Sequence, residues 1–199
     1  DEASARELIQ SLTGQSLVVK SLEESPRTER PKPPFTTSTM QQDAGSRLGW
    51  GAQLTMRIAQ RLYENGYITY MRTDSVTLSS SSITAARSSA QSLYGKEFVP
   101  ATPRVYEGKT KNAQEAHEAV RPTSIARTPE SLKKALRPDQ AALYEMIWKR
   151  TVASQMAAAK FDTTSVDLSA NPKGTTFRAS GQILVFPGFM SVYLEGADD

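Results

Sequence analysis

The chain contains no cysteine and a single histidine, and these two shortages remove several kinds of chemistry at once. Without cysteine it can form no disulfide, use no thiolate nucleophile and build no thiolate metal site. One histidine is too few for a typical zinc site. A catalytic site in this chain must therefore rely on other side chains.

Long apolar runs and a secretory leader are also missing. No stretch of about 18 apolar residues could cross a membrane, and the opening Asp-Glu-Ala-Ser-Ala-Arg does not have the composition of a signal peptide. The chain also starts without Met. We therefore expect a cytoplasmic protein without membrane partners, cut from a longer polypeptide.

A strong charge of one sign is absent as well, since 24 basic residues face 21 acidic ones, for a net charge of +3 and a pI of 9.1. This mild excess permits a nucleic-acid partner if the basic side chains gather on one face. The 199 residues suffice for one large or two small domains with a hydrophobic core.

The order of patterns along the chain is strand-rich, helical, then strand-rich again. Residues 15–22 read as a strand, residues 23–34 as a proline-rich connector, and the last part of the chain as further strands. We predict an α+β fold in which a mostly helical domain, residues 36–159, is inserted into a small antiparallel β domain formed by residues 1–35 and 160–199.

Apolar stripes at helical spacing, with Ser, Thr, Pro and Gly at the expected ends, predict several helices. They cover residues 3–13, 38–48, 52–65 and 79–94, a short helix that starts at residue 128, and a long helix over residues 138–159. The second and third of these are joined by a glycine-containing turn and carry Arg47, Arg57 and Arg61. They predict a helix-turn-helix-like unit with a basic surface.

Residues 66–75, Gly-Tyr-Ile-Thr-Tyr-Met-Arg-Thr-Asp-Ser, are the strongest indication of chemistry. In an extended chain, side chains alternate between faces, so Tyr70 and Arg72 project to the same side. A phenolate can attack a phosphodiester, and a guanidinium can hold the phosphate oxygens as charge builds on them. The alternative is a Tyr–Arg pair that packs or stacks without chemistry.

Residues 113–122, Ala-Gln-Glu-Ala-His-Glu-Ala-Val-Arg-Pro, form a second segment rich in polar donors. On a helix, Gln114, His117 and Arg121 would share one face, and Pro122 would end that helix. Amide, imidazole and guanidinium donors suit a phosphate backbone. A surface helix held by Glu–Arg pairs is the alternative.

The two segments, in this order, resemble the two signatures of type IA DNA topoisomerases. At position 71 the sequence resembles the bacterial topoisomerase I branch, because it has Met where the topoisomerase III branch usually has proline. The resemblance covers roughly residues 34–190 and implies a helical domain that carries the tyrosine within a β arch. It also implies that Tyr70 attacks single-stranded DNA and forms a reversible covalent 5′-phosphotyrosine linkage, through which negatively supercoiled DNA is relaxed without ATP.

Roles for the individual residues follow from the chemistry and the resemblance together. Arg72 would clamp the phosphate oxygens. His117, with Gln114 and Arg121, would contact the DNA backbone. Asp74 would orient Arg72 through a carboxylate–guanidinium pair, or else cap the turn that follows.

Type IA enzymes also use an acidic, magnesium-binding domain and a further domain that completes the DNA gate, and this sequence contains no Asp-x-Asp cluster. The resemblance thus implies Mg²⁺ in the full-length enzyme, no metal or other cofactor in this chain, and no activity from this chain alone. The expected partners are DNA, mainly single-stranded and in the nucleoid, and the missing domains of the same polypeptide. The competing hypothesis is a non-catalytic module in which Tyr70 stacks on the bases of single-stranded DNA.

Overall fold

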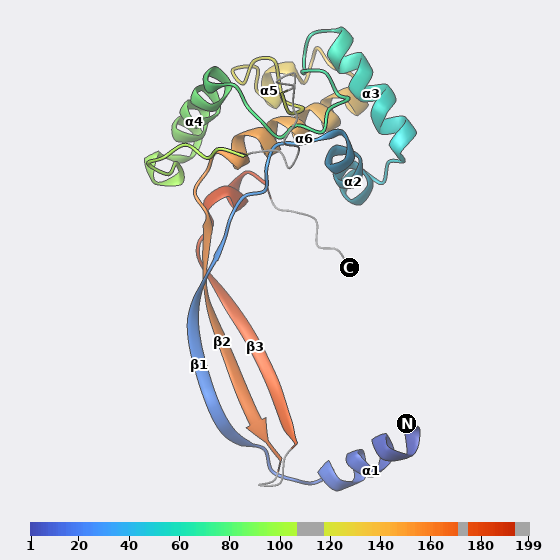
Figure 1. Cartoon of the computed structure of the whole chain (residues 1–199), viewed down its shortest axis with the longest axis vertical. Helices are drawn as coiled ribbons and strands as arrows, with labels where there is room; N and C mark the ends of the chain where they lie inside the picture. The colour runs from blue at the N-terminus through green and yellow to red at the C-terminus, as the bar shows by residue number, and fades with distance from the viewer. Residues whose placement is uncertain (107–117, 171–174, 194–199) are drawn as a thin grey trace. The chain divides into compact units, whose positions relative to one another are not determined.

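The structure, a computed structural model, describes residues 1–106, 118–170 and 175–193 (Figure 1). Its described part combines helices with a three-stranded antiparallel sheet. The predicted α+β class is therefore confirmed.

The chain divides into two compact units. Asp1–Glu29 and Ala159–Phe186 form one, here called the sheet unit, and Arg30–Ala158 and Pro187–Asp199 form the other, here called the helical unit. These limits differ from the expected ones mainly in two places, because residues 30–35 and 187–199 belong to the helical unit.

Buried aromatic residues explain these limits. Phe35, Phe189 and Tyr193 are all almost fully buried, and the Phe189 N–H donates to the Ala157 carbonyl at 2.9 Å. Buried aromatic side chains contribute strongly to the stability of a core, and these three belong to the core of the helical unit. The chain therefore leaves the sheet before Phe35 and again before Phe189.

In the sheet unit, β1 (Val18–Glu29), β2 (Ala159–Ser169) and β3 (Thr176–Phe186) lie in the order β1-β2-β3, with β2 paired antiparallel to both neighbours (Figure 1). A single helix, α1 (Glu2–Leu12), precedes them, and the Asp1 side chain caps its first turn by accepting from the Ser4 N–H. Strands far apart in sequence are thus brought together by antiparallel pairing.

The first strand is longer than predicted. We expected it to end near residue 22 and the prolines to open a connector, but β1 continues to Glu29, and Pro26 pairs with Asp162. Proline is tolerated in a sheet on an edge strand, where its missing N–H can face away from the ladder. Because β1 is such an edge, the connector prediction was wrong for residues 23–29.

Most side chains of the sheet unit are exposed, including the apolar ones. No residue of α1 is buried, and neither β1 nor β3 buries a side chain. The exposed large apolar side chains of this unit are Leu8, Ile9, Leu17, Val18, Val19, Leu22, Phe177, Ile183, Leu184 and Val185. Within the described residues the sheet is therefore held mainly by its backbone ladder and by polar pairs, such as Arg178 with Asp167 at 2.7 Å.

The helical unit contains the remaining helices of the described chain. They are α2 (Thr37–Leu48), α3 (Ala52–Glu64), α4 (Ser80–Tyr94), η1 (Lys96–Phe98), α5 (Pro129–Leu132), α6 (Pro138–Ser154) and η2 (Gly188–Ser191). Most begin and end within a few residues of the predicted positions, because caps and apolar periodicity are local signals.

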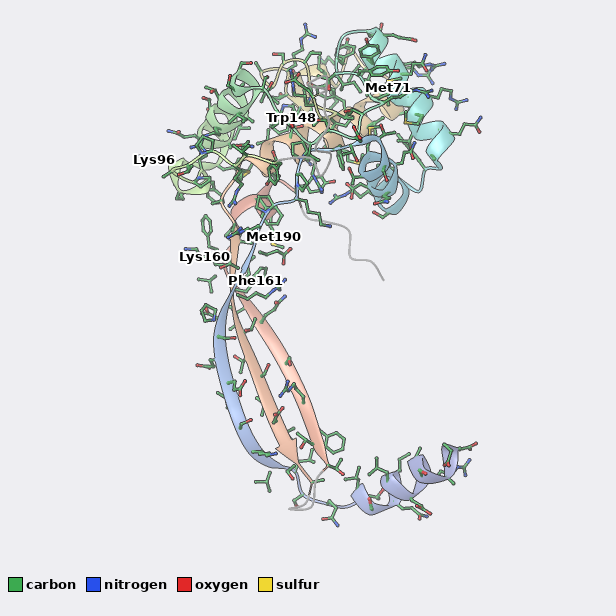
Figure 2. All side chains as sticks on the ribbon, in the orientation of Figure 1. Met71, Lys96, Trp148, Lys160, Phe161 and Met190 are labelled. Carbon is green, nitrogen blue, oxygen red and sulfur yellow. The ribbon has the colours of Figure 1, made fainter. Side chains whose placement is uncertain are left out.

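Helix α6 forms the centre of this unit. From Leu143 to Ser154 every residue except Glu145 and Lys149 is buried, and α3, α4, α5 and η2 all contact it. The indole N–H of Trp148 donates to the Ile125 carbonyl at 2.9 Å; Figure 2 shows Trp148 among the side chains that fill the unit. A helix that is buried on every side except the Glu145–Lys149 stripe is well placed to support the elements around it.

Helices α2 and α3 meet across a turn in which Gly49 adopts φ 67°, as the helix-turn-helix-like pattern predicts. The predicted basic surface is only partly present. Arg57 and Arg61 are exposed, but Arg47 bonds to Asp43 at 3.0 Å and its guanidinium lies 4.0 Å from the centre of the Tyr193 ring. Arg47 therefore serves packing in this structure.

Candidate active site around Tyr70

The residues that follow α3, 66–74, are here called the Tyr70 segment. Gly66 adopts φ 71°, a conformation that glycine allows without strain, and turns the chain out of the helix. Ile68 and Met71 are almost fully buried. These two side chains anchor the segment against the helical unit.

Exposure alternates along the segment. Tyr70, Arg72 and Asp74 are exposed, whereas Met71 is buried and Thr73 is half-buried. This alternation is what an extended chain produces when one face packs and the other meets solvent. Tyr70 keeps 46% of its surface exposed, so the side chain is accessible to a large substrate.

An open hollow lies beside the Tyr70 ring. It is lined by Gln60, Tyr63, Glu64, Tyr70, Met71 and Arg72. The rings of Tyr63 and Tyr70 meet edge to face, with centroids 5.2 Å apart. The helix α3 and the Tyr70 segment thus place Tyr70 and Arg72 on the same hollow.

Asp74 is exposed on the same run. In the described part of the chain it makes no hydrogen bond or ion pair, either with Arg72 or with the turn that follows. The expected pairing of Asp74 with Arg72 is therefore absent from this structure.

The predicted second segment lies partly outside the described residues, and Gln114 and His117 are among those outside. The described end, Glu118–Pro122, is not helical. Val120 bridges antiparallel to Phe35, and Pro122 bridges antiparallel to Ile68. The helix prediction was wrong here, because pairing with two buried neighbours competes with the local helical pattern.

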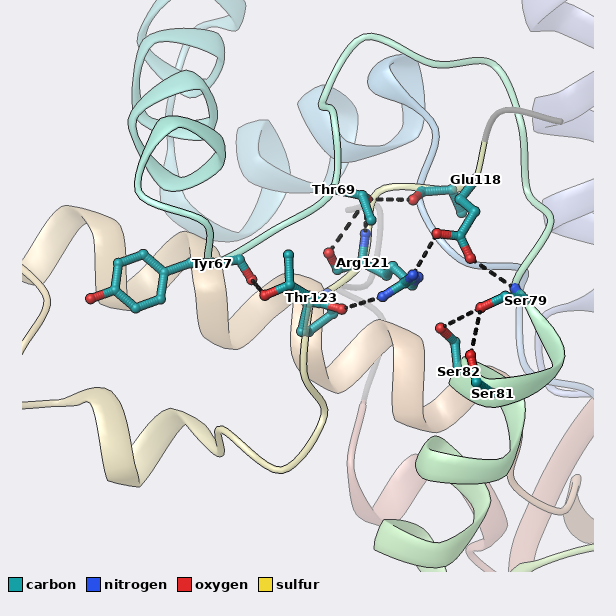
Figure 3. A network of polar contacts seen from close by, with 10 residues as sticks. Tyr67, Thr69, Ser79, Ser81, Ser82, Glu118, Arg121 and Thr123 are labelled. Carbon is teal, nitrogen blue, oxygen red and sulfur yellow. Dashed lines mark hydrogen bonds and ion pairs between the residues drawn. The ribbon is translucent and has the colours of Figure 1, made fainter. Parts of the chain in front are cut away.

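Arg121 takes part in an internal network (Figure 3). Its guanidinium donates to the Glu118 carboxylate and, at 2.8 Å, to the Pro122 carbonyl. Glu118 in turn accepts from the Ser79 N–H at 2.9 Å, just before the first residue of α4. A carboxylate at this place satisfies a free N–H and complements the helix dipole.

The pKa of Glu118 reflects this environment. Burial would raise the pKa, but hydrogen bonds from Arg121 and Ser79 outweigh burial and hold it below its ordinary value. Glu118 is therefore a carboxylate at neutral pH. The Arg121 side chain, which is only 14% exposed, forms an ion pair with it.

Thr69 ties the Tyr70 segment to Glu118–Pro122. Its hydroxyl donates to the Ala119 carbonyl at 2.7 Å and accepts from the Arg121 N–H at 3.0 Å, while its own N–H donates to the Arg121 carbonyl at 2.9 Å. Figure 3 shows Thr69 in contact with the segment that carries Glu118 and Arg121. The N-terminal side of Tyr70 is thus fixed.

Thr37 ties down the other side, and sequence reasoning missed it. Its hydroxyl lies 2.7 Å from the Met71 carbonyl and 2.8 Å from the Thr73 nitrogen. We placed the start of this helix at Ser38, but Thr36 is the cap. The capping spacing of the Thr-rich run was a visible signal, but nothing local pointed from Thr37 to residues 71 and 73.

The described residues hold no group of three or more His, Cys, Asp or Glu that could bind a metal ion. None of the helices described is long and apolar enough to cross a membrane.

Comparison with known proteins gives one consistent result. The sequence model of the DNA topoisomerase family matches residues 1–199. The chain is 53% identical to DNA topoisomerase 1 of Mycolicibacterium smegmatis, with all of this chain and 22% of that protein aligned. It is 51% identical to DNA topoisomerase 1 of a Synechocystis species, again over all of this chain and 22% of that protein.

A solved structure agrees with these sequence matches. The full-length topoisomerase I of Thermotoga maritima superimposes with a TM-score of 0.80 at 35% identity, over 98% of this chain and 33% of that one. The chain thus spans about a fifth of the curated relatives it matches.

Proposed function

This chain belongs to the DNA topoisomerase family, and from that premise we propose that it is the part of a bacterial, type IA topoisomerase I that carries the DNA-cleaving tyrosine. The observation that carries the proposal is the exposed phenol of Tyr70 on one hollow with Arg72, in a segment anchored on both sides. The substrate is single-stranded DNA, and the full-length protein acts in the cytoplasm on the nucleoid.

The reaction is a reversible transesterification. The Tyr70 oxygen bonds to the phosphorus of a phosphodiester and the bond from phosphorus to the 3′ oxygen breaks, so the DNA 5′ phosphate is left on the tyrosine. The phenol gives up its proton and the departing 3′ oxygen takes one up. Because the linkage conserves the bond energy, religation by the 3′ hydroxyl needs no ATP, and relaxation of negatively supercoiled DNA can proceed between the two steps.

Arg72 supplies the electrostatic part of the mechanism. Its side chain is exposed and has no hydrogen bond or ion pair with any described residue, so its donors are available to phosphate. A guanidinium stays charged at all working pH values and can hold two phosphate oxygens at once. Charge on those oxygens grows in the transition state, where such a contact contributes most.

Magnesium, which the family resemblance implies, does not fit the residues found here. The hollow beside Tyr70 is lined by a single carboxylate, Glu64, and that carboxylate accepts from the Gln60 amide at 2.8 Å. Mg²⁺ prefers several oxygen ligands, usually with carboxylates among them. We therefore place the metal in another part of the full-length protein and expect this chain alone to be inactive in relaxation.

A second candidate function has one observation in its favour. Tyr63 and Tyr70 are neighbouring aromatic side chains that keep 43% and 46% of their surface exposed. Exposed aromatic rings can stack on the bases of single-stranded DNA without any chemistry. In this alternative the chain would be a binding module.

A covalent-adduct assay separates the two functions. The full-length protein is mixed with a single-stranded oligonucleotide labelled at its 3′ end, and denaturant then reveals any label that stays on the protein. We expect an adduct with the wild type and none with Tyr70→Phe, which keeps the ring but lacks the attacking oxygen, while both bind DNA with similar affinity. Tyr63→Phe is the matched control and should still form the adduct.

Two outcomes would contradict the proposal. An adduct that persists in Tyr70→Phe would exclude Tyr70 as the nucleophile. Tight binding by the wild type with no adduct under any metal condition would favour the binding module.

A further inference from the structure

Thr37 contacts the backbone on both sides of Arg72, and from these contacts we propose that it is a positioning residue for the Arg72 guanidinium. The inference rests on the proposed function, in which Arg72 holds the phosphate that Tyr70 attacks. Thr37 acts through the chain that carries Arg72.

Four contacts join Thr37 to this chain. The Thr37 hydroxyl donates to the Met71 carbonyl at 2.7 Å, with the Thr73 carbonyl at 3.1 Å as a second acceptor. The same oxygen accepts from the Thr73 N–H at 2.8 Å. The Thr37 N–H donates to the Thr73 carbonyl at 2.8 Å.

The hydroxyl therefore holds both peptide units that flank Arg72. The Met71 carbonyl belongs to the peptide before Arg72, and the Thr73 N–H belongs to the peptide after it. Each peptide is planar, so only φ and ψ of Arg72 can change between them. One oxygen bound to both peptides restricts these two angles and sets the direction in which the Arg72 side chain leaves the chain.

This restriction matters because no hydrogen bond or ion pair within the described residues orients the Arg72 side chain itself. Its side chain is exposed and makes no hydrogen bond or ion pair within the described residues, whereas Met71 on the opposite face is 3% exposed. A long free side chain can reach phosphate from many starting directions, most of them unproductive. A fixed backbone makes the Arg72 side chain start from one direction, beside the hollow that Tyr70 also lines.

Threonine suits this place for a chemical reason. The first residues of a helix have N–H groups without partners inside the helix, and Thr37, the first residue of α2, uses its own on Thr73. A hydroxyl can donate and accept at the same time. Valine has the same shape but can do neither, so Thr37→Val removes the hydroxyl contacts and leaves the N–H contact in place.

The first measurement compares chemistry with binding in the full-length protein. We expect Thr37→Val to slow single-turnover cleavage of a 3′-labelled single-stranded oligonucleotide by about 10–100-fold, the scale on which a small misplacement of a catalytic group acts. Affinity for the uncleaved oligonucleotide should change little. Thr37→Ser, which restores the hydroxyl, should recover most of the rate.

A double-mutant cycle tests whether Thr37 acts through Arg72. In an Arg72→Ala background the group to be positioned is gone. Adding Thr37→Val should therefore slow cleavage by less than about threefold relative to Arg72→Ala alone. Thr151→Val is the matched control, because the buried Thr151 hydroxyl bonds only to the Ile147 carbonyl of its own helix, at 2.8 Å. It should leave the cleavage rate unchanged in both backgrounds.

The outcomes separate this inference from the function on which it rests. A wild-type cleavage rate in Thr37→Val, or losses that multiply with Arg72→Ala, would overturn the positioning role even if Tyr70→Phe is inactive as expected. An adduct in Tyr70→Phe would overturn the function itself. Should Thr37→Val fold poorly, Thr37→Ala removes the same hydroxyl with a smaller side chain. Its cleavage rates in the wild-type and Arg72→Ala backgrounds then test the positioning role in the same way.

Discussion

The helical unit buries its apolar side chains, whereas the sheet unit leaves most of its own exposed. Leu143 and Ile147 of α6 are fully buried, and Ile183 of β3 keeps 72% of its surface exposed. The sheet is held by a long antiparallel ladder of backbone hydrogen bonds and by polar pairs. These interactions depend little on the shape of the apolar side chains. The Tyr70 segment belongs to the unit with a core, where the buried Ile68 and Met71 and the hydroxyls of Thr37 and Thr69 hold the segment in place.

The comparison predicts a large difference between two truncations of similar size. Leu143→Ala should destabilise the helical unit by about 2–5 kcal/mol, because it leaves a cavity in a packed core. Both tryptophans, Trp50 and Trp148, lie in this unit, so urea unfolding followed by tryptophan fluorescence measures the loss.

Ile183→Ala in β3 is the matched change in the sheet unit. It should alter the protection of the β2–β3 ladder against amide hydrogen exchange by no more than about 0.5 kcal/mol, as is usual for exposed positions. A loss at Ile183 comparable to that at Leu143 would mean that the sheet face is covered in solution, and the contrast between the units would fail.

The internal ion pair of the site should show an intermediate effect. Glu118→Gln leaves the Arg121 guanidinium, which is 14% exposed, without its carboxylate, and an unsatisfied buried polar group costs about 1–3 kcal/mol. Asp167→Asn, which breaks the Arg178 pair on the sheet, should cost less because Arg178 is 64% exposed. Equal losses in thermal unfolding of the two variants would contradict this ranking.

The smallest predicted effect is the dependence of stability on pH and of the two carboxyl pKa values on salt. The pKa of Glu118 is lowered because its hydrogen bonds outweigh the effect of burial, and that of Asp167 is lowered by its hydrogen bonds from Arg178. For a lowered pKa, the stabilisation is complete above the ordinary values, 4.5 and 3.8, and is lost as pH falls through the lower folded-state pKa.

Salt should separate the two carboxyls. Exposed pairs are screened more strongly than buried ones, so added salt should bring the pKa of Asp167 back toward its ordinary value and change that of Glu118 less. Carboxyl titration by NMR at low and high ionic strength measures both. A larger salt response at Glu118 would show that its pair with Arg121 is open to solvent.

Much of the helical framework could be predicted from the sequence, because its signals are local. Gly49 and Gly66 mark the ends of α2 and α3, and apolar spacing marks the faces that pack. The contrast between exposed Tyr70 and buried Met71 follows from simple alternation along ten residues. The phenol and the guanidinium in that run led to the prediction of phosphoryl chemistry, which stays a prediction.

Contacts between distant residues were decided only by the tertiary structure. Val120 pairs with Phe35, so Glu118–Pro122 is extended where the local pattern favours a helix. Arg121 is consequently held by Glu118, although its sequence context suits a phosphate contact. Gln114 and His117 lie outside the described residues, and their predicted roles stay predictions.

The sequence by itself determined the candidate side chains of the Tyr70 segment and most helix ends, since both depend on residues within a few positions of each other. The tertiary structure decided which distant residues hold the backbone that carries those side chains. Thr37 holds residues 71 and 73 from more than thirty positions away, and Pro26 joins the sheet because β1 lies at its edge. A hydrogen bond forms wherever folding brings a donor close to an acceptor. Contacts between residues far apart in the sequence therefore cannot be predicted from local spacing.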